Sequence, residues 1–225
     1  MLKNGILYLV STPIGNLEDI TLRAIRILKE VDIIAAEDTR HTLLLLGNLG
    51  IKNQLESYHS YNRLRQTPRL IEKLISGKNI ALVSDAGTPG ISDPANHLVA
   101  AAIERQISVV PIPGPTAAIA ALVASGLPTD QFYFGGFLPA KKGRKKRILE
   151  LSKLTETVVL YESPHRLLKT LYELKTCFGN RPIAVCRELT KRFEEITRGG
   201  IDDAVRFFSN KTIRGEFVLV IRGEG

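Results

Sequence analysis

Short apolar runs alternate with amphipathic stretches through the first half of the chain. The apolar runs predict buried strands over residues 6–10, 31–36, 55–58, 79–83 and 107–112. Between and after them, apolar residues recur at helical spacing over residues 21–29, 41–49, 68–76, 95–105 and 116–124. Repeated strand–helix units of this kind predict a parallel sheet wrapped by helices.

The second half keeps the strand pattern but brings the strands closer together. Strands are expected over residues 132–137, 157–161, 183–187, 194–198 and 216–221, and helices over 145–154, 167–178 and 201–209. Close spacing favours antiparallel pairing, and hence a mixed sheet. The pattern breaks near residue 127, so we expect an α/β fold of two domains, residues 1–126 and 127–225. A cleft between two such domains favours a small-molecule site.

Residues 84–94 form the most informative loop, because they join a predicted buried strand to a predicted helix. They combine small residues with two aspartates and two prolines, and include Asp85, Gly87 and Thr88. Ligands of open α/β sheets bind beyond the carboxyl ends of strands, and glycine lets backbone approach a ligand closely. The alternative is a tight strand-to-helix turn capped by an aspartate.

Three further loops follow predicted strands. Residues 12–17 fit neither the dinucleotide-binding nor the Walker pattern of glycines, so they are either a turn or a loop against a ligand. Residues 36–41 contain several neighbouring ionisable side chains, which suit either proton transfer or simple capping of a helix. Residues 113–118 form a stiff proline-rich turn before a helix of small residues, which either leaves room for a ligand or packs tightly.

Charge points to an anionic partner. The 225 residues contain 31 Lys and Arg against 23 Asp and Glu, a net charge of +8. Residues 141–147, here called the basic run, hold a dense group of cations that predicts contact with RNA or DNA, the alternative being a solvated loop. Its cations are Lys141, Lys142, Arg144, Lys145, Lys146 and Arg147.

Several classes of protein lack their signatures. The two cysteines lie outside any metal-binding or redox pattern, and no histidine shows metal-ligand spacing, so we expect no metal. No leader and no membrane-length apolar run is visible, which predicts a cytoplasmic protein that avoids membranes. No nucleophile elbow or Cys/His dyad indicates covalent catalysis.

Acid–base pairs recur beside the later predicted strands: residues 161–166 and 187–191 each follow a strand, and residues 214–216 precede the last one. Each pair alone is more often a structural ion pair or a helix cap. Their shared position at strand ends favours a site.

Seven segments, taken in order, resemble one known family: residues 9–17, 35–42, 83–89, 113–115, 136–139, 161–166 and 187–191. They are similar to the bacterial small-subunit ribosomal RNA 2′-O-methyltransferases that modify a cytidine of the decoding centre, within the tetrapyrrole-methylase superfamily. The resemblance implies S-adenosylmethionine bound between two α/β domains, a ribosomal RNA or ribosomal-subunit substrate, and often a homodimer.

The resemblance also assigns site residues. It places cofactor contacts on Pro13, Ile14, Asp85, Gly87, Thr88, Thr116, Ala117, Tyr161 and Glu216. Methylation of a hydroxyl benefits from a proton acceptor, for which the candidates are Glu37, Asp85, His165, Glu188 and Lys191. Arg40 and Arg166 join the basic run as candidate RNA contacts.

Some relatives carry a small further domain, whereas this sequence ends at Gly225. We therefore expect the basic run, a dimer surface or the ribosomal particle itself to provide the contacts that bind RNA. Two alternatives stay open: a methyltransferase acting on a tetrapyrrole or other small molecule, and an RNA-binding accessory protein without catalysis.

Overall fold

A computed structural model describes residues 4–225, and the chain divides into two compact units, with the boundary between Thr116 and Ala117. This division comes earlier than the boundary expected after residue 126. Helix α5 (Ala117–Ser125) causes the difference, because Ala118, Ala121 and Leu122 are buried and the helix packs on the second unit's sheet. A helix that is apolar nearly all round gives no sign in the sequence of which sheet it covers.

The first unit is built on a parallel sheet of five strands, as predicted. They are β1 (Leu7–Val10), β2 (Ile33–Ala36), β3 (Leu55–Ser57), β4 (Ile80–Val83) and β5 (Val109–Ile112), in the order β3-β2-β4-β1-β5. Strands β2 and β4 are buried throughout, which explains their continuous apolar sequences.

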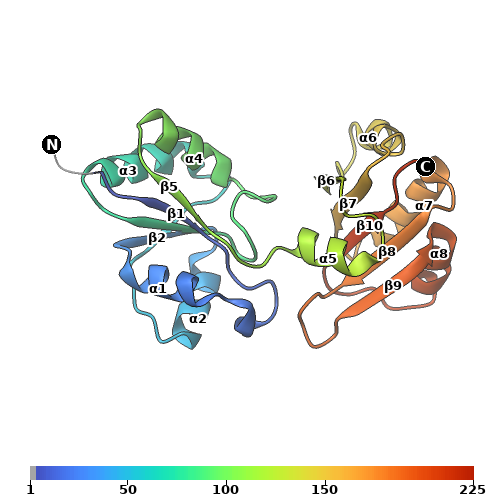
Figure 1. Cartoon of the computed structure of the whole chain (residues 1–225), viewed down its shortest axis with the longest axis horizontal. Coiled ribbons are helices and arrows are strands. Elements are labelled where there is room, and N and C mark those ends of the chain that lie inside the picture. Colours follow the sequence, from blue (N-terminus) through green and yellow to red (C-terminus); the bar gives the residue numbers. More distant parts are fainter. Residues whose placement is uncertain (1–3) are drawn as a thin grey trace. The chain divides into compact units, whose positions relative to one another are not determined.

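Helices cover both faces of this sheet (Figure 1). Helices α1 (Leu22–Glu30) and α2 (Thr39–Asn48) pack on one face through Leu28 and Leu46. Helices α3 (Arg63–Ile75) and α4 (Ala95–Glu104) pack on the other through Leu70 and Leu98. A short 3-10 helix, η1 (Leu17–Asp19), precedes α1.

Helix α3 begins earlier than the start predicted at residue 68. Pro68 was expected in the first turn, where its missing N–H costs nothing, but it lies inside the helix. Asn62 precedes the helix, and its side chain bonds the Ser57 carbonyl oxygen at 3.1 Å and the His59 N–H at 2.8 Å. These local bonds hold the turn between β3 and the helix, and the spacing of apolar residues does not reveal them.

The order of connections places a switch point between β1 and β4. The chain leaves β1 through α1 on one face of the sheet, whereas it leaves the neighbouring β4 through α4 on the other. The loops after these two strands therefore depart in opposite directions. Open α/β sheets bind their ligands at such a point, beyond the carboxyl ends of the strands.

The second unit holds the predicted mixed sheet. Its strands are β6 (Phe132–Phe137), β7 (Thr157–Glu162), β8 (Pro182–Arg187), β9 (Glu195–Gly200) and β10 (Phe217–Ile221), in the order β6-β7-β10-β8-β9. Strands β6 and β7 are parallel, and the other pairs are antiparallel.

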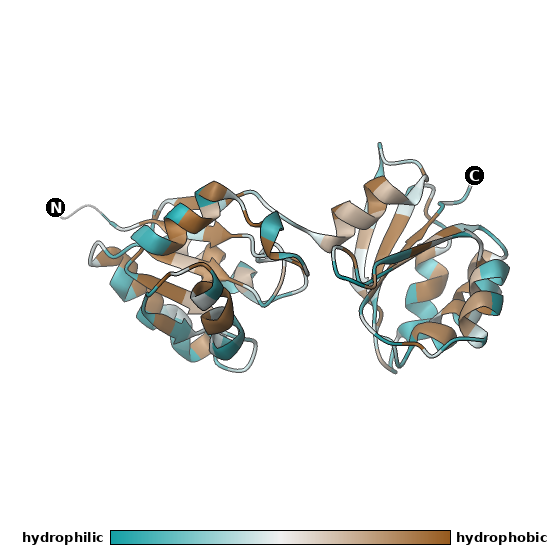
Figure 2. Ribbon diagram, turned by 90° about the horizontal axis from the view of Figure 1, so that it is seen from below, coloured by the Kyte–Doolittle hydropathy of each residue, from teal (hydrophilic) through white to brown (hydrophobic). Residues whose placement is uncertain are grey.

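This second sheet is also covered on both sides. Helices α6 (Arg144–Leu151), α7 (Leu167–Phe178) and α8 (Ile201–Ser209) share a core with Val158, Leu160 and Leu219, and α5 packs on strands β7, β8 and β10. The central strands are accordingly hydrophobic along their length, while the covering helices carry hydrophilic residues as well (Figure 2).

Candidate functional site: two sheet edges

The loops after β1 and β4 are joined at the switch point. Thr12 and Gly87 exchange two backbone hydrogen bonds, of 2.9 and 3.0 Å. Gly87 has a φ of +82°, and a Cβ added there would lie 3.3 Å from Ile14 Cγ2 and 3.5 Å from the Pro115 carbonyl oxygen. Glycine is therefore needed for this close approach of three loops.

Hydroxyl groups connect the loop after β5 to the loops after β1 and β4. Thr88 Oγ1 donates to the Pro115 carbonyl oxygen at 3.0 Å and lies 2.9 Å from Ser11 Oγ. A threonine hydroxyl has one hydrogen, so Ser11 is the donor to Thr88. A Cβ at Gly114 would lie only 2.7 Å from Ser11 Cβ. The loops after β1, β4 and β5 thus form one rigid surface, here called the first sheet edge.

Carboxylates line the neighbouring end of β2. The Asp38 N–H donates to Asp85 Oδ1 at 2.9 Å, which links the β2 and β4 loops. Asp85 is exposed, whereas Glu37 is half-buried. Burial raises the pKa of Glu37, and the negative charge of Asp85 adds to that effect. Glu37 therefore holds a proton more readily than an ordinary glutamate.

Asp93 closes the long loop after β4. Its carboxylate accepts the Gly90 N–H at 2.8 and 2.9 Å and the Ala95 N–H at 3.0 Å. Burial outweighs these bonds and raises the pKa of Asp93. Ser92, the residue before it, has a left-handed φ of +72°. Asp93 thus holds the turn that leads into α4, whose N-cap residue is Pro94, and the same loop also joins the first sheet edge through Gly87.

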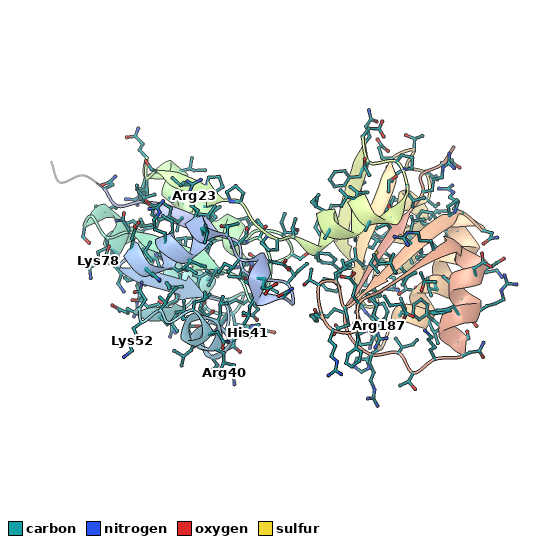
Figure 3. All side chains as sticks on the ribbon, turned by 60° about the horizontal axis from the view of Figure 1, so that its bottom comes forward. Arg23, Arg40, His41, Lys52, Lys78 and Arg187 are labelled. Atoms are coloured by element: carbon teal, nitrogen blue, oxygen red, sulfur yellow. The ribbon has the colours of Figure 1, made fainter. Side chains whose placement is uncertain are left out.

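Arg40 stands at the start of α2 and points outward, as does His41 (Figure 3). The Arg40 guanidinium donates hydrogen bonds of 2.7 and 3.1 Å to the Asp38 carboxylate, and these bonds lower the pKa of Asp38. Arg40 is exposed but already paired. Other labelled cations of this unit, Arg23, Lys52 and Lys78, lie at separate places on its surface (Figure 3).

The second sheet brings the later predicted segments to a common edge, as expected. Phe217, which opens β10, pairs with Glu162 at the end of β7 and with Arg187 at the end of β8. Phe137, at the end of β6, pairs with Tyr161. Residues 161–166, 187–191 and 216 therefore gather at what we call the second sheet edge.

Lys191 connects two carboxylates at this edge. Its Nζ lies 2.9 Å from Glu188 Oε1 and 2.9 Å from Glu216 Oε2. The Glu216 N–H also donates to Glu188 Oε1 at 2.9 Å. Desolvation acts against both charges, but the hydrogen bonds and opposite charges outweigh it: the pKa of Glu188 is lowered and that of Lys191 is raised. The raised pKa favours the protonated form of Lys191, and a protonated amine cannot accept a further proton.

The backbone around this ion cluster is strained. Glu188 and Thr190 have left-handed φ values of +48° and +65°, and Gly215 one of +91°. A Cβ at Gly215 would lie 2.5 Å from Glu188 Cγ. Thr190 Oγ1 is buried without a hydrogen-bond partner among residues 4–225. Strain of about 1–3 kcal/mol per residue collects at functional sites, which supports a site here.

Tyr161 and helix α5 meet within the second unit. The Ala118 N–H, in the first turn of α5, donates to the Tyr161 hydroxyl at 3.2 Å. The rings of Phe134 and Phe137 contact the Tyr161 ring edge-to-face at 5.1 and 5.5 Å. Ala117, which opens α5, is therefore near Tyr161 within the second unit. His165 is exposed on the loop that follows β7.

The basic run divides into two kinds of residue. Lys141, Lys142, Lys145 and Lys146 are exposed. Arg144, which was predicted to contact RNA, is only 4% exposed, because its guanidinium bonds Thr170 and Glu173 inside the second unit. The Arg147 guanidinium lies over the Tyr133 ring at 5.2 Å, and Arg166 is only partly exposed.

The described residues hold neither a cluster of metal-ligand side chains nor a helix that could span a membrane. Within residues 4–225, no three His, Cys, Asp or Glu side chains gather so that they could hold a metal ion. No helix in the same part of the chain is long and apolar enough to cross a membrane.

Ser11, Gly114 and Thr190 lie in segments that the sequence analysis singled out, but none of the three was named there as a candidate site residue. Gly114 carried a signal, since it lies between two prolines at a predicted strand end. Ser11 and Thr190 carried none, because their roles depend on contacts with residues distant in sequence or on backbone strain.

The two-unit α/β fold defines a class that includes solved methyltransferases. A uroporphyrin-III-C-methyltransferase from Thermus thermophilus matches with a TM-score of 0.69 at 23% identity, covering 97% of this chain and 94% of that one. A cobalt precorrin-4 methyltransferase matches with a TM-score of 0.70 at 18% identity, covering 96% and 94%. These likenesses establish the fold.

The chain belongs to the Tetrapyrrole (Corrin/Porphyrin) Methylases, the family whose sequence profile matches residues 6–205. Among curated relatives, a protein of Halalkalibacterium halodurans is 54% identical over 98% of this chain and 77% of its own length. One of Synechocystis is 55% identical over 97% of this chain and 79% of its own. Both are named ribosomal RNA small subunit methyltransferase I.

Proposed function

We propose that this protein transfers a methyl group from S-adenosylmethionine to the ribose 2′-hydroxyl of a cytidine in small-subunit ribosomal RNA. The observation that carries the proposal is the 54% identity, over 98% of the chain, to a relative named as a methyltransferase of that RNA. The matched region of 222 residues includes both sheet edges, so the relative supports the reaction as well as the fold.

The residues of the first sheet edge fit the donor. S-adenosylmethionine supplies a methyl group on a positively charged sulfur, which is already activated for displacement. The rigid loops carrying Pro13, Ile14, Gly87 and Thr88 offer backbone and small side chains. The nearby carboxylates of Asp85 and Glu37 suit a cationic ligand. In the second unit, Tyr161, Ala117 and Glu216 are the proposed further contacts.

We propose Glu37 as the proton acceptor among the five candidates. Its raised pKa makes it the better base, whereas Glu188 has a lowered pKa and Lys191 is protonated. A positioned base contributes about 10²–10⁴-fold to such a transfer. Alignment of the reacting groups supplies much of the remainder. The Glu188–Lys191–Glu216 cluster then serves to orient the substrate.

The exposed lysines of the basic run are the proposed phosphate contacts, together with Arg40 and Arg166. We further propose a homodimer that works in the cytoplasm and needs no metal ion. Light scattering of the purified protein tests the dimer, and activity after treatment with a chelator tests the independence from metal.

Labelled S-adenosylmethionine and a panel of acceptors test the proposal. We expect label on small ribosomal subunits or their RNA and none on uroporphyrin. Label on the tetrapyrrole alone would favour the small-molecule alternative. Donor binding in calorimetry without transfer to any acceptor would favour an accessory protein.

A further inference from the structure

Two arginines hold the loop that carries the first lysines of the basic run. Residues 138–143 connect β6 to α6 and include Lys141 and Lys142. Arg166 Nη1 donates to the Leu138 carbonyl oxygen at 3.1 Å, and Arg144 Nη1 donates to the Pro139 carbonyl oxygen at 3.2 Å. Both arginines therefore bind the backbone at the base of one loop.

A buried carboxylate anchors the two arginines. Glu162, at the end of β7, is 2% exposed and pairs with Arg166 Nη2 at 2.8 Å. It also accepts the Ser163 N–H at 2.8 Å and the Thr170 hydroxyl at 2.6 Å. Arg144 Nη2 in turn donates to that same Thr170 oxygen at 2.6 Å. Thr170 thus links Arg144 to Glu162.

Arg144 is also tied to α7 directly, since its Nε donates to Glu173 Oε2 at 2.7 Å. The cluster so formed, Glu162 with Arg144, Arg166, Thr170 and Glu173, connects β7, α6, α7 and the loop. The rigid fork of an arginine can bind a carbonyl and a side chain at once, which a lysine ammonium does poorly.

Stability alone does not account for this cluster. Well-packed apolar residues often replace buried ion pairs without loss of stability. What apolar residues cannot do is bind the carbonyl groups of Leu138 and Pro139. A backbone fixed in advance lowers the ordering cost when its side chains meet a ligand.

We propose that Arg144, Glu162 and Thr170 are positioning residues, which hold the loop 138–143 so that Lys141 and Lys142 meet RNA phosphates. Arg144 then acts on RNA binding through the loop and touches no phosphate itself. The inference rests on the proposed function, because it assumes that the substrate is RNA. It assigns these buried residues the role of supporting the loop that binds the RNA.

A matched pair of variants at Thr170 tests the proposal. Thr170 is 0% exposed, so no substitution there removes an RNA contact. Thr170→Val keeps the shape but deletes the hydroxyl, whereas Thr170→Ser keeps the hydroxyl. We expect Thr170→Val to weaken binding of small-subunit RNA about tenfold, with Thr170→Ser close to wild type. Affinity for S-adenosylmethionine stays within about twofold in both. For every phosphate that the protein no longer neutralises, the slope of log affinity against log salt becomes shallower by about 0.7–0.9.

Arg144→Lys provides a second test of the proposal, and Arg181→Lys serves as its control. Arg181 lies beside the start of β8, at the opposite edge of the sheet, where it bonds Glu224 at 3.4 Å. We expect Arg144→Lys to reduce RNA affinity and the salt slope, and Arg181→Lys to change neither. Melting temperatures of all variants separate loss of binding from loss of fold.

A combined variant decides between positioning and a general structural role. If the cluster acts through the loop lysines, Thr170→Val adds nothing once Lys141→Gln and Lys142→Gln are present. Additive losses, or a folded Thr170→Val protein with wild-type RNA affinity and salt slope, would overturn the inference alone. Wild-type protein that neither binds nor methylates small-subunit RNA would instead overturn the proposed function.

Discussion

Glu37 and Glu188 are both glutamates at strand ends, yet their surroundings move their pKa values in opposite directions. Burial and the charge of Asp85 raise the pKa of Glu37. At Glu188, desolvation is outweighed by the Glu216 N–H and by Lys191, so its pKa is lowered. Pairs of carboxylates separated in this way often divide into a group that exchanges protons and one that stays charged.

Glu37→Gln should therefore lower turnover by about 10²–10⁴-fold while leaving affinity for S-adenosylmethionine within about threefold. The wild-type rate should fall on acidification at a pH above the usual glutamate range, because Glu37 must lose its proton to act. A pH profile of single-turnover rates checks this. If Glu188→Gln rather than Glu37→Gln removes this fall in rate at acidic pH, then Glu188 is the proton acceptor and the assignment to Glu37 is wrong.

Lys191→Ala should lower turnover more than it lowers affinity for the donor. Removing the ammonium leaves Glu188 and Glu216 close together without their shared cation. Glu188 then loses part of the interaction that holds its pKa low, and stability drops most above the pKa of the unfolded carboxyl, where Glu188 is ionised. Turnover and calorimetry on the folded variant measure the two effects, and unchanged methylation would reject the assignment.

The two cysteines should differ in reactivity. Burial raises the pKa of Cys186 to about 11, and its side chain is 0% exposed, whereas Cys177 is only partly buried. The thiolate is the reactive form, so Cys186 stays inert near neutral pH. We expect a thiol reagent to label Cys177 first and Cys186 only on unfolding. Labelling of Cys177→Ser at the native rate would contradict this.

At the scale of elements, the first sheet edge depends on how closely its loops approach one another. Gly114→Ala should destabilise the protein by about 1–3 kcal/mol, because overpacking forces Ser11 and its loop apart. Gly47→Ala is the matched control: Gly47 lies in α2 with nothing within 4 Å of an added Cβ. That change should stabilise by about 0.5–1 kcal/mol. Denaturant unfolding compares the two, and equal effects would show that the loops are not closely packed.

Most strands and helices were predictable because their signals are local. The sequence predicted all ten strands of residues 4–225, nine from short apolar runs and β9 from a mixed polar and apolar pattern, with ends shifted by a few residues at most. The boundary between the units was not predictable, since α5 is apolar nearly all round and tertiary packing alone assigns it to the second sheet.

The sequence predicted which residues follow the ends of strands, but it did not predict how each side chain is paired or buried. Arg144 was counted with its exposed neighbours, although it is buried. The helical spacing could have indicated that Arg144 is buried. Arg144, Ile148 and Leu151 lie on one face of α6, and all three are buried. The strain at Glu188 and Thr190 depends on the folded backbone, so no residue pattern announces it.

At the scale of the whole molecule, the two units contribute different chemistry. The first offers a rigid edge with half-buried carboxylates, which suits a cationic methyl donor. The second offers an ion cluster, a strained loop and exposed lysines, which suit a polyanionic acceptor. The net charge of +8 agrees with that division.

Mapping of the modified nucleotide tests the central claim most directly. Small ribosomal subunits from a strain lacking this protein would be incubated with the purified protein and labelled S-adenosylmethionine, and the RNA digested for mass spectrometry. The account predicts a new 2′-O-methylcytidine at a single position. A methyl group on a base, on another nucleoside, or no transfer at all would contradict it.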